Sequence, residues 1–161
     1  MAPPALLDPG CPLCADAGGR VLVRAGAWRI VLAGDPDYPA FTRVVWSTHV
    51  AEMSDLGEEQ RGELMRVVLE VERAQRAALS PDKINLASFG NVVPHLHWHV
   101  IPRWRDDRHF PEPVWGRPAA GRDEAVAARR AAVLGRLDAY IETLRRRLGG
   151  SADPGAGTIV A

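Results

Sequence analysis

The chain has 161 residues, of which 47% are hydrophobic and 25% charged, and its 20 basic side chains balance its 20 acidic ones. This length suffices for one domain with a sizeable core, and the neutral sum gives no support for general attraction to nucleic acids or membranes. No apolar stretch approaches the roughly 20 residues that span a bilayer, and the N-terminus lacks a signal peptide's positive start and long apolar centre. The two cysteines, Cys11 and Cys14, lie too close together for a useful structural disulfide, so we expect a reducing, cytoplasmic setting.

The first half of the chain predicts three strands. Residues 20–24 and 27–33 are rich in Val, Leu, Ile and Trp and flank Gly26, a pattern typical of a β-hairpin. Two prolines indicate a loop over residues 34–39. A third strand is predicted over residues 41–47.

A long helix is predicted next, over residues 56–79. Asp55 resembles a helix N-cap with Glu58 three residues further on, and Pro81 ends the helix. The apolar residues that recur at helical spacing are Leu64, Val68, Val71 and Ala78.

The second half predicts two more strands, over residues 83–89 and 96–101, with a tight turn over 90–94 between them. Three prolines indicate an irregular loop over 105–118. Strands in hairpin succession with helices inserted between them favour an antiparallel sheet in an α+β domain.

One amphipathic helix is expected to follow this loop and to end at Gly149 and Gly150, before a disordered tail over residues 151–161. The face opposite its apolar stripe is rich in arginine. The stripe consists of Val126, Val133, Leu137, Tyr140 or Ile141, Leu144 and Leu148.

Three histidines, His95, His97 and His99, alternate with apolar residues at the predicted fifth strand. Because successive side chains of a strand point to opposite faces, the three imidazoles share one face, each roughly 7 Å from the next. The apolar residues between them point into the core. Imidazole changes charge near neutral pH and serves as a nucleophile and a metal ligand, so this run predicts a functional site.

The run from His95 to Ile101 has the pattern His-φ-His-φ-His-φ-φ, where φ is apolar, with Gly90–Pro94 before it and Pro102 and Arg103 after it. It resembles the signature of the histidine triad (HIT) family of nucleotide hydrolases and transferases. The likeness extends over about residues 11–105, and within the family the chain resembles bacterial members similar to diadenosine tetraphosphate hydrolase.

The resemblance implies a HIT-like fold, a five-stranded antiparallel sheet with helices packed on it. It places a HIT domain over residues 8–110, followed by a C-terminal loop and amphipathic helix over 111–150 and the tail over 151–161. HIT proteins of this size are often homodimers, and the last helix would mediate the dimer or cover the sheet.

The resemblance also assigns catalytic roles to the histidines. The middle one, His97, would attack the α-phosphate and form a nucleotidyl-histidine, which splits one hard hydrolysis into two easier steps. His99 would donate to a phosphate oxygen or to the leaving group. His95 either contacts phosphate or binds a metal, and we favour the metal.

Backbone N–H groups of the glycine-containing turn can bind phosphate as well. Many relatives have Gln followed by Ser or Thr at the turn, whereas this chain has Asn91 followed by Val92. The missing hydroxyl leaves the leaving group and the preferred substrate open. Asp35, with Asp37 nearby, lies where relatives place an acid on the ribose, although a solvated Asp-Pro turn is equally compatible with it. The candidate nucleotide-binding residues are Asn85, Gly90, Asn91, Val92, Val93 and Asp35.

Two simpler explanations of the histidine run are possible. A half-buried strand can tolerate histidines, since imidazole is intermediate in burial preference. A metal site made of the three histidines alone is disfavoured, because residues two apart on a flat strand are too widely spaced to share one small ion readily.

Cys11 and Cys14 have the Cys-x-x-Cys spacing of a zinc knuckle, and a closed tetrahedral site needs two further ligands. Some HIT relatives supply them from a histidine after the third strand and from the first triad histidine, which match His49 and His95. Such a zinc would be structural. The alternatives are a thioredoxin-like redox pair, which needs a preceding strand in a βαβ setting, and unmetallated cysteines with His49 on the surface.

Other residues carry weaker signals. His109 is expected to be an ordinary loop histidine, and Trp104 or Trp115 could line a base pocket. Arg103 and Arg105 could help to bind phosphate, although exposed arginines are common.

These observations predict hydrolysis of a nucleoside phosphoanhydride or phosphoramidate at the α-phosphate, through a nucleotidyl-His97 intermediate. A dinucleoside polyphosphate such as diadenosine tetraphosphate is the expected substrate, and a nucleoside phosphoramidate is the next. The alternatives are a nucleotide-binding or scaffold protein with little turnover and a zinc-dependent interaction module. A need for Mg²⁺ is not determined.

Overall fold

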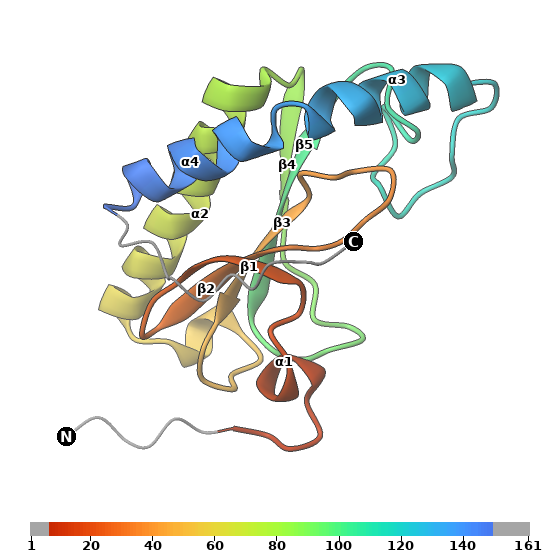
Figure 1. Cartoon of the computed structure of the whole chain (residues 1–161). Coiled ribbons are helices and arrows are strands. Elements are labelled where there is room, and N and C mark those ends of the chain that lie inside the picture. Colours follow the sequence, from red (N-terminus) through yellow and green to blue (C-terminus); the bar gives the residue numbers. More distant parts are fainter. Residues whose placement is uncertain (1–6, 150–161) are drawn as a thin grey trace, which may run out of the picture.

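A five-stranded antiparallel sheet forms the centre of the computed structural model, which describes residues 7–149 (Figure 1). The strand order is β1-β2-β3-β5-β4, and every pairing is antiparallel. The predicted α+β class and five-stranded sheet are thereby confirmed, whereas the predicted tail over 151–161 lies outside the described residues. The strands are β1 (Arg20–Arg24), β2 (Trp28–Leu32), β3 (Thr42–Trp46), β4 (Lys83–Ala87) and β5 (His97–Arg103).

The sheet is covered on both faces, which explains why β2 is buried along its whole length. Alternate residues of a strand point to opposite faces. Ile30 and Val44 therefore join the main core, which lies between the sheet and two helices, α2 and α4. Val31 and Val45 point the other way and pack with the N-terminal segment around Cys11.

Helix α2 (Glu58–Leu79) is the long helix expected from the sequence, and its buried stripe lies on the sheet. The predicted N-cap at Asp55 is wrong. Met53–Asp55 instead forms a short 3-10 helix. Gly57 caps α2, and its N–H donates to Oε1 of Gln60 at 2.9 Å, which satisfies one of the free N–H groups at the helix start.

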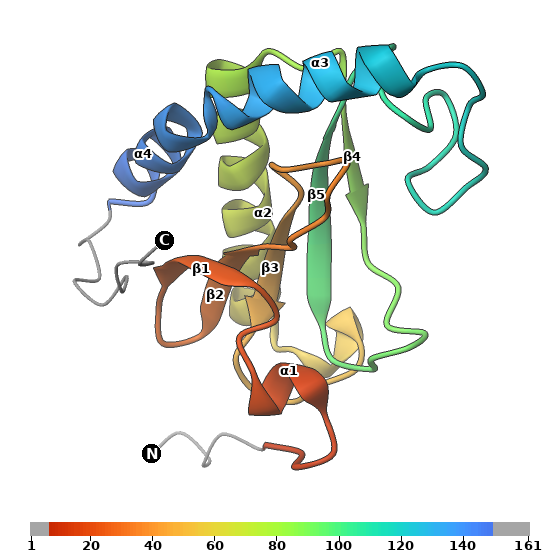
Figure 2. The same cartoon turned by 45° about the vertical axis from the view of Figure 1, so that its right-hand side comes forward.

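The single C-terminal helix expected from the apolar stripe is instead two helices, α3 (Asp123–Leu134) and α4 (Leu137–Arg147). The break falls at Gly135, where glycine costs about 1 kcal/mol relative to alanine in a helix. The break lets α4 lie beside α2, with Tyr140 and Leu144 fully buried (Figure 2). None of the helices within residues 7–149 is both long and apolar enough to cross a membrane.

A short helix that the sequence analysis did not predict, α1 (Pro12–Ala15), lies near the turn between β4 and β5 (Figure 2). Arg29 of β2 secures it. Only 6% of the Arg29 side chain is exposed, and its guanidinium donates to the carbonyl oxygens of Leu13 and Ala17 at 2.5 and 2.9 Å. Helix α1 thereby becomes a fixed wall beside the face of the sheet that α2 leaves free.

Strand β5 begins one residue later than the predicted strand over 96–101 and is two residues longer at its end. His95 belongs to the preceding turn, where its N–H donates to the carbonyl of Val93 at 2.8 Å. His95 therefore lies before the start of the strand and is not part of its alternating pattern of side chains. The next two histidines share one face of β5, and the apolar residues that alternate with them pack in the main core, as predicted.

Candidate active site

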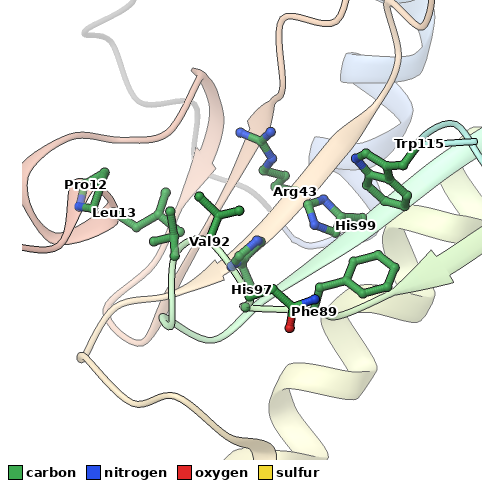
Figure 3. Close-up of a pocket in the computed structure, with 11 residues that line it drawn as sticks. Pro12, Leu13, Arg43, Phe89, Val92, His97, His99 and Trp115 are labelled. Carbon is green, nitrogen blue, oxygen red and sulfur yellow. The ribbon is translucent and has the colours of Figure 1, made fainter.

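A pocket of about 590 Å³ lies on the face of the sheet opposite α2 (Figure 3). Strands β3 and β5 contribute its arginine and histidine side chains, while α1, the turn before β5 and the loop after β5 surround them. Its lining is Pro12, Leu13, Arg43, Phe89, Gly90, Asn91, Val92, Val93, His97, His99 and Trp115.

His97 is held in the orientation that a nucleophilic imidazole needs. Its Nδ1–H donates to the carbonyl oxygen of His95 at 2.5 Å, so the lone pair is on Nε2. Burial is the main cause that lowers the pKa of His97; the hydrogen bond to His95 opposes the shift, and the nearby Arg43 adds to it. A neutral ring is the form that attacks phosphorus.

His99 lies next to His97, with the two ring centroids 4.8 Å apart. Burial, with smaller effects from His97 and Arg43, lowers the pKa of His99 to about 3. Its Nδ1 is buried and finds no hydrogen-bond partner within residues 7–149. The proton of the neutral ring is therefore better placed on Nε2, from which it can be donated to a ligand.

The mouth of the pocket is apolar and aromatic. The rings of Phe89 and Trp115 meet edge to face with their centroids 4.9 Å apart, and the ring centroids of Trp115 and His99 are 5.1 Å apart. Gly90 has a φ of 73°, a conformation that glycine adopts without strain, so the turn can pass close to the histidines. Of the two tryptophans considered for a base pocket, Trp115 lines this pocket. Trp104 is buried in the main core.

Beside the pocket, four potential metal ligands converge, namely Cys11, Cys14, His49 and His95, with their ligand atoms all within 4.8 Å of one another. Nδ1 of His95 lies 3.4 and 3.5 Å from the two sulfurs, and Nδ1 of His49 lies 3.5 Å from Sγ of Cys14. Bond lengths to zinc of about 2.3 Å for sulfur and about 2.0 Å for nitrogen place tetrahedral ligand atoms about 3.5 Å apart. The donor set and its spacing fit zinc.

The second nitrogen of each histidine supports this fit. Nε2–H of His95 donates to the carbonyl of Trp46 at 2.7 Å, and Nε2 of His49 lies 3.8 Å from a carboxylate oxygen of Asp8. These contacts leave both Nδ1 lone pairs directed at the thiols, as metal-binding histidines require. His95 is completely buried in this cluster and does not line the pocket, so its side chain lies with the potential metal ligands, and its predicted catalytic role stays a prediction.

Two predicted phosphate contacts lie outside the pocket. Arg103 is 2% exposed and forms an ion pair with Asp107, so its predicted phosphate role is wrong. Its Nη1 donates to Oδ1 of Asn85 at 2.7 Å. Asn85 faces a separate surface hollow, and its predicted nucleotide contact stays a prediction.

The acidic loop residues are also occupied elsewhere. The carboxylate of Asp35 accepts hydrogen bonds from the N–H groups of Asp37 and Tyr38 at 2.9 and 3.1 Å. These bonds form the Asp-Pro turn that the sequence offered as the alternative to a ribose contact. Asp37 pairs with Arg108 at 2.7 Å. His109 stacks on Tyr38, as expected of an ordinary loop histidine. Neither acid lines the pocket, and the predicted ribose contact of Asp35 stays a prediction.

Four residues that line the pocket were missed by sequence reasoning: Pro12, Leu13, Arg43 and Phe89. Arg43 carried a usable signal, because a lone charged residue in an apolar strand needs a reason to be there. Leu13 lies between the two cysteines, and Phe89 comes directly before the glycine of the turn. Neither has a local pattern that distinguishes it from a core residue.

Comparison with known proteins adds family evidence to this geometry. The model of the HIT domain matches residues 17–106, inside the predicted segment 8–110, whose boundaries stay predictions. The AP-4-A phosphorylase of Mycobacterium tuberculosis H37Rv is 30% identical over 105 residues, which cover 62% of this chain and 54% of that protein. This chain therefore spans about half the length of the curated relatives it matches.

Two solved structures are similar in fold. A histidine triad protein from Bradyrhizobium japonicum superposes with a TM-score of 0.63 at 30% identity, over 81% of this chain and 91% of that one. A zinc-bound histidine triad family protein from Mycobacterium smegmatis gives a TM-score of 0.53 at 26% identity, over 81% and 96%.

Proposed function

Because this chain belongs to the HIT domain family, we propose that it hydrolyses a nucleoside polyphosphate at the α-phosphate through a nucleotidyl-His97 intermediate. The observation that carries the proposal is the placement of His97. Its Nδ1–H is held by the carbonyl of His95, while the ring lines a pocket beside His99.

In the first step, the lone pair on Nε2 of His97 forms a bond to the α-phosphorus. The bond from phosphorus to the bridging oxygen breaks, and its electron pair leaves with the phosphate chain. The positive charge that develops on the ring is stabilised by the hydrogen bond from Nδ1–H to the carbonyl of His95. Nε2–H of His99 donates to an oxygen on which charge builds up.

In the second step, a water oxygen attacks the phosphorus and the N–P bond breaks, with its electron pair returning to Nε2 of His97. The water loses one proton to solvent, and the nucleoside monophosphate leaves. The backbone N–H groups of the turn formed by Gly90, Asn91, Val92 and Val93 are the further donors that we assign to the phosphate oxygens.

The substrate that we favour is a dinucleoside polyphosphate such as diadenosine tetraphosphate. The aromatic mouth made by Phe89 and Trp115 suits a nucleobase, and the relative from M. tuberculosis is named AP-4-A phosphorylase. Its name also supports a second candidate reaction, phosphorolysis, in which inorganic phosphate replaces water in the second step. The products distinguish the two reactions, because hydrolysis releases AMP and phosphorolysis releases ADP.

We further propose that Cys11, Cys14, His49 and His95 hold a structural zinc, as their spacing allows. The zinc-bound relative from M. smegmatis supports this assignment. Intact thiolates need a reducing compartment, which favours the cytoplasm.

A homodimer is the assembly that we propose, as is common in proteins of this type and size. Strand β4 is the last strand of the sheet, so one of its edges is unpaired, and unpaired edges are ready to associate. Leu86 on β4 and Leu69 on α2 are exposed.

The test is nucleotide release from diadenosine tetraphosphate and from adenosine 5′-phosphoramidate, with and without inorganic phosphate. We expect wild type to release AMP and His97→Ala to lose at least about 1,000-fold in kcat, as expected when a covalent nucleophile is removed. Denaturation of wild type in alkaline detergent during turnover should trap AMP on the protein, because the P–N bond of a nucleotidyl-histidine survives alkali but not acid, and His97→Ala should trap none.

The folding of the variant is checked by its melting temperature and bound zinc, both of which should match wild type. ADP in place of AMP would select phosphorolysis. Binding of AMP by wild type without turnover of either substrate would overturn the enzymatic proposal in favour of a nucleotide-binding protein.

A further inference from the structure

Arg43 is the one lining residue of the pocket that carries a formal positive charge. It is the second residue of β3 and pairs with His99 of β5 in the antiparallel register. Directly opposed residues of neighbouring antiparallel strands point to the same face, so the guanidinium stands over the same surface as the catalytic histidines. Figure 3 shows Arg43, His97 and His99 gathered around the pocket.

Some contacts hold the guanidinium of Arg43 in place, but part of its hydrogen-bonding capacity is not satisfied within the described residues. Nη1 donates to the carbonyl of Gly18 at 3.0 Å, and the ring of Phe41 lies 5.7 Å from Cζ. Nε is buried and has no hydrogen-bond partner among residues 7–149. No carboxylate in the described part of the chain forms an ion pair with Arg43. Burial lowers the pKa of Arg43, and the more distant charge of Asp35 opposes this shift only in part. A half-buried cation without a directly paired carboxylate is costly unless a ligand supplies the charge.

The proposed reaction requires a positive charge in the pocket, which Arg43 can supply. An imidazole attacks phosphorus only when it is unprotonated, so His97 brings no positive charge to the substrate. A phosphate chain that leaves carries several negative charges, and these require fixed cationic or N–H donors. Within the lining, only Arg43 offers a full charge together with the planar fork of donors that suits phosphate oxygens.

We propose that Arg43 binds the phosphate chain of the leaving group and thereby selects polyphosphate substrates over phosphoramidates. This inference rests on the proposed function, because it concerns the same pocket and reaction. A phosphoramidate has an uncharged amine as its leaving group and gives Arg43 no phosphate chain to bind. Arg43 would also compensate for the missing hydroxyl at Val92, since a charged donor takes over the leaving-group contact.

The experiment compares Arg43→Leu with wild type on diadenosine tetraphosphate and on adenosine 5′-phosphoramidate. We expect the ratio of kcat/KM for the two substrates to fall by about tenfold or more, which corresponds to the loss of one charge-assisted contact. Arg43→Lys keeps the charge but loses the fork and should recover part of the ratio. Arg24→Leu is the matched control, since Arg24 is exposed at the end of β1 outside the pocket and should leave the ratio unchanged.

A second measurement does not depend on turnover. Titration of inorganic tripolyphosphate should show binding weakened by about tenfold in Arg43→Leu, while adenosine binding stays the same. An equal loss on both substrates, or tripolyphosphate binding that Arg43→Leu does not change, would overturn the inference. Should wild type hydrolyse neither substrate, the proposed function fails, and the titration still decides the role of Arg43. Bound zinc and melting temperature identify a variant that has failed to fold.

Discussion

Asp107 and Arg103 form a buried ion pair that shapes the loop after β5. The two side chains are 3% and 2% exposed, and Nε of Arg103 lies 2.7 Å from Oδ2 of Asp107. Burial by itself raises the pKa of Asp107, but hydrogen bonds from Arg103 and from the N–H groups of His109 and Phe110 bring it below its usual 3.8. The hydroxyl of Tyr38 also donates to this carboxylate.

Asp107→Asn tests this pair. We expect the free energy of unfolding at neutral pH to fall by about 3 kcal/mol, because Arg103 is left as an uncompensated buried charge. Since the folded-state pKa is lowered, the contribution of Asp107 is fully present above its usual 3.8 and is lost as the pH falls through the lower folded-state value. Urea unfolding from about pH 3 to about pH 8 measures the difference in the free energy of unfolding between wild type and Asp107→Asn. This difference should become smaller only in acid.

The neighbouring carboxylate provides the control. Asp106 pairs with Arg129 at 2.8 Å, with 44% of its side chain exposed, and such exposed pairs contribute about 0–1 kcal/mol. Equal destabilisation by Asp106→Asn and Asp107→Asn would contradict the role given to the buried pair.

The loop after β5 brings Trp115 from beyond the matched HIT segment, residues 17–106, into contact with the site. The tryptophan is 52% exposed and lies edge to face with Phe89 at the pocket mouth. An exposed aromatic ring at a pocket mouth is well placed to stack on a base. This loop is held by the ion pair described above, and it therefore links the stability of the fold to the shape of the pocket mouth.

Trp115→Ala is expected to raise KM for diadenosine tetraphosphate by about tenfold, within the range of base–aromatic stacking, and to change kcat less. Trp115→Phe retains a ring and should recover most of the affinity. Steady-state kinetics of the three proteins measure this effect. A fall in kcat with unchanged KM would instead assign Trp115 to the chemical step.

The cluster of four potential metal ligands connects three distant parts of the chain. Cys11 and Cys14 come from the N-terminal segment, His49 from the region after β3, and His95 from the turn before β5. Leu13, between the two cysteines, lines the pocket. The carbonyl of His95 orients His97. A metal at this cluster would therefore stabilise both the fold and the pocket wall.

Metal analysis of the purified protein should find about one zinc per chain, and less than about a tenth of an equivalent in Cys14→Ser. A metal that binds only the folded state stabilises it by about 2.7 kcal/mol when its free concentration is a hundred times Kd. Chelation should accordingly lower the melting temperature of wild type but not that of Cys14→Ser. His109→Ala, a histidine outside the cluster, serves as the control and should retain its zinc. If wild type contains no zinc and its melting temperature does not change on chelation, the proposal of a structural zinc is wrong.

The elements that could be predicted from the sequence are those with a strong local pattern. The five strands and α2 follow from alternation and helical spacing, which depend on neighbouring residues alone. The N-cap of α2 and the break at Gly135 were missed, because cap contacts and the packing of α4 on α2 choose between local conformations of similar energy.

The sequence alone was sufficient for the strand with His97 and His99, the turn at Gly90 and the four residues that could bind a metal, since these follow from short motifs and the family resemblance. Only the tertiary structure placed His95 before the start of β5, removed Arg103 from the pocket, and placed Arg43 opposite His99. The physical reason is that strand register and burial bring together residues far apart in the chain, and no local pattern records which partner a side chain will meet.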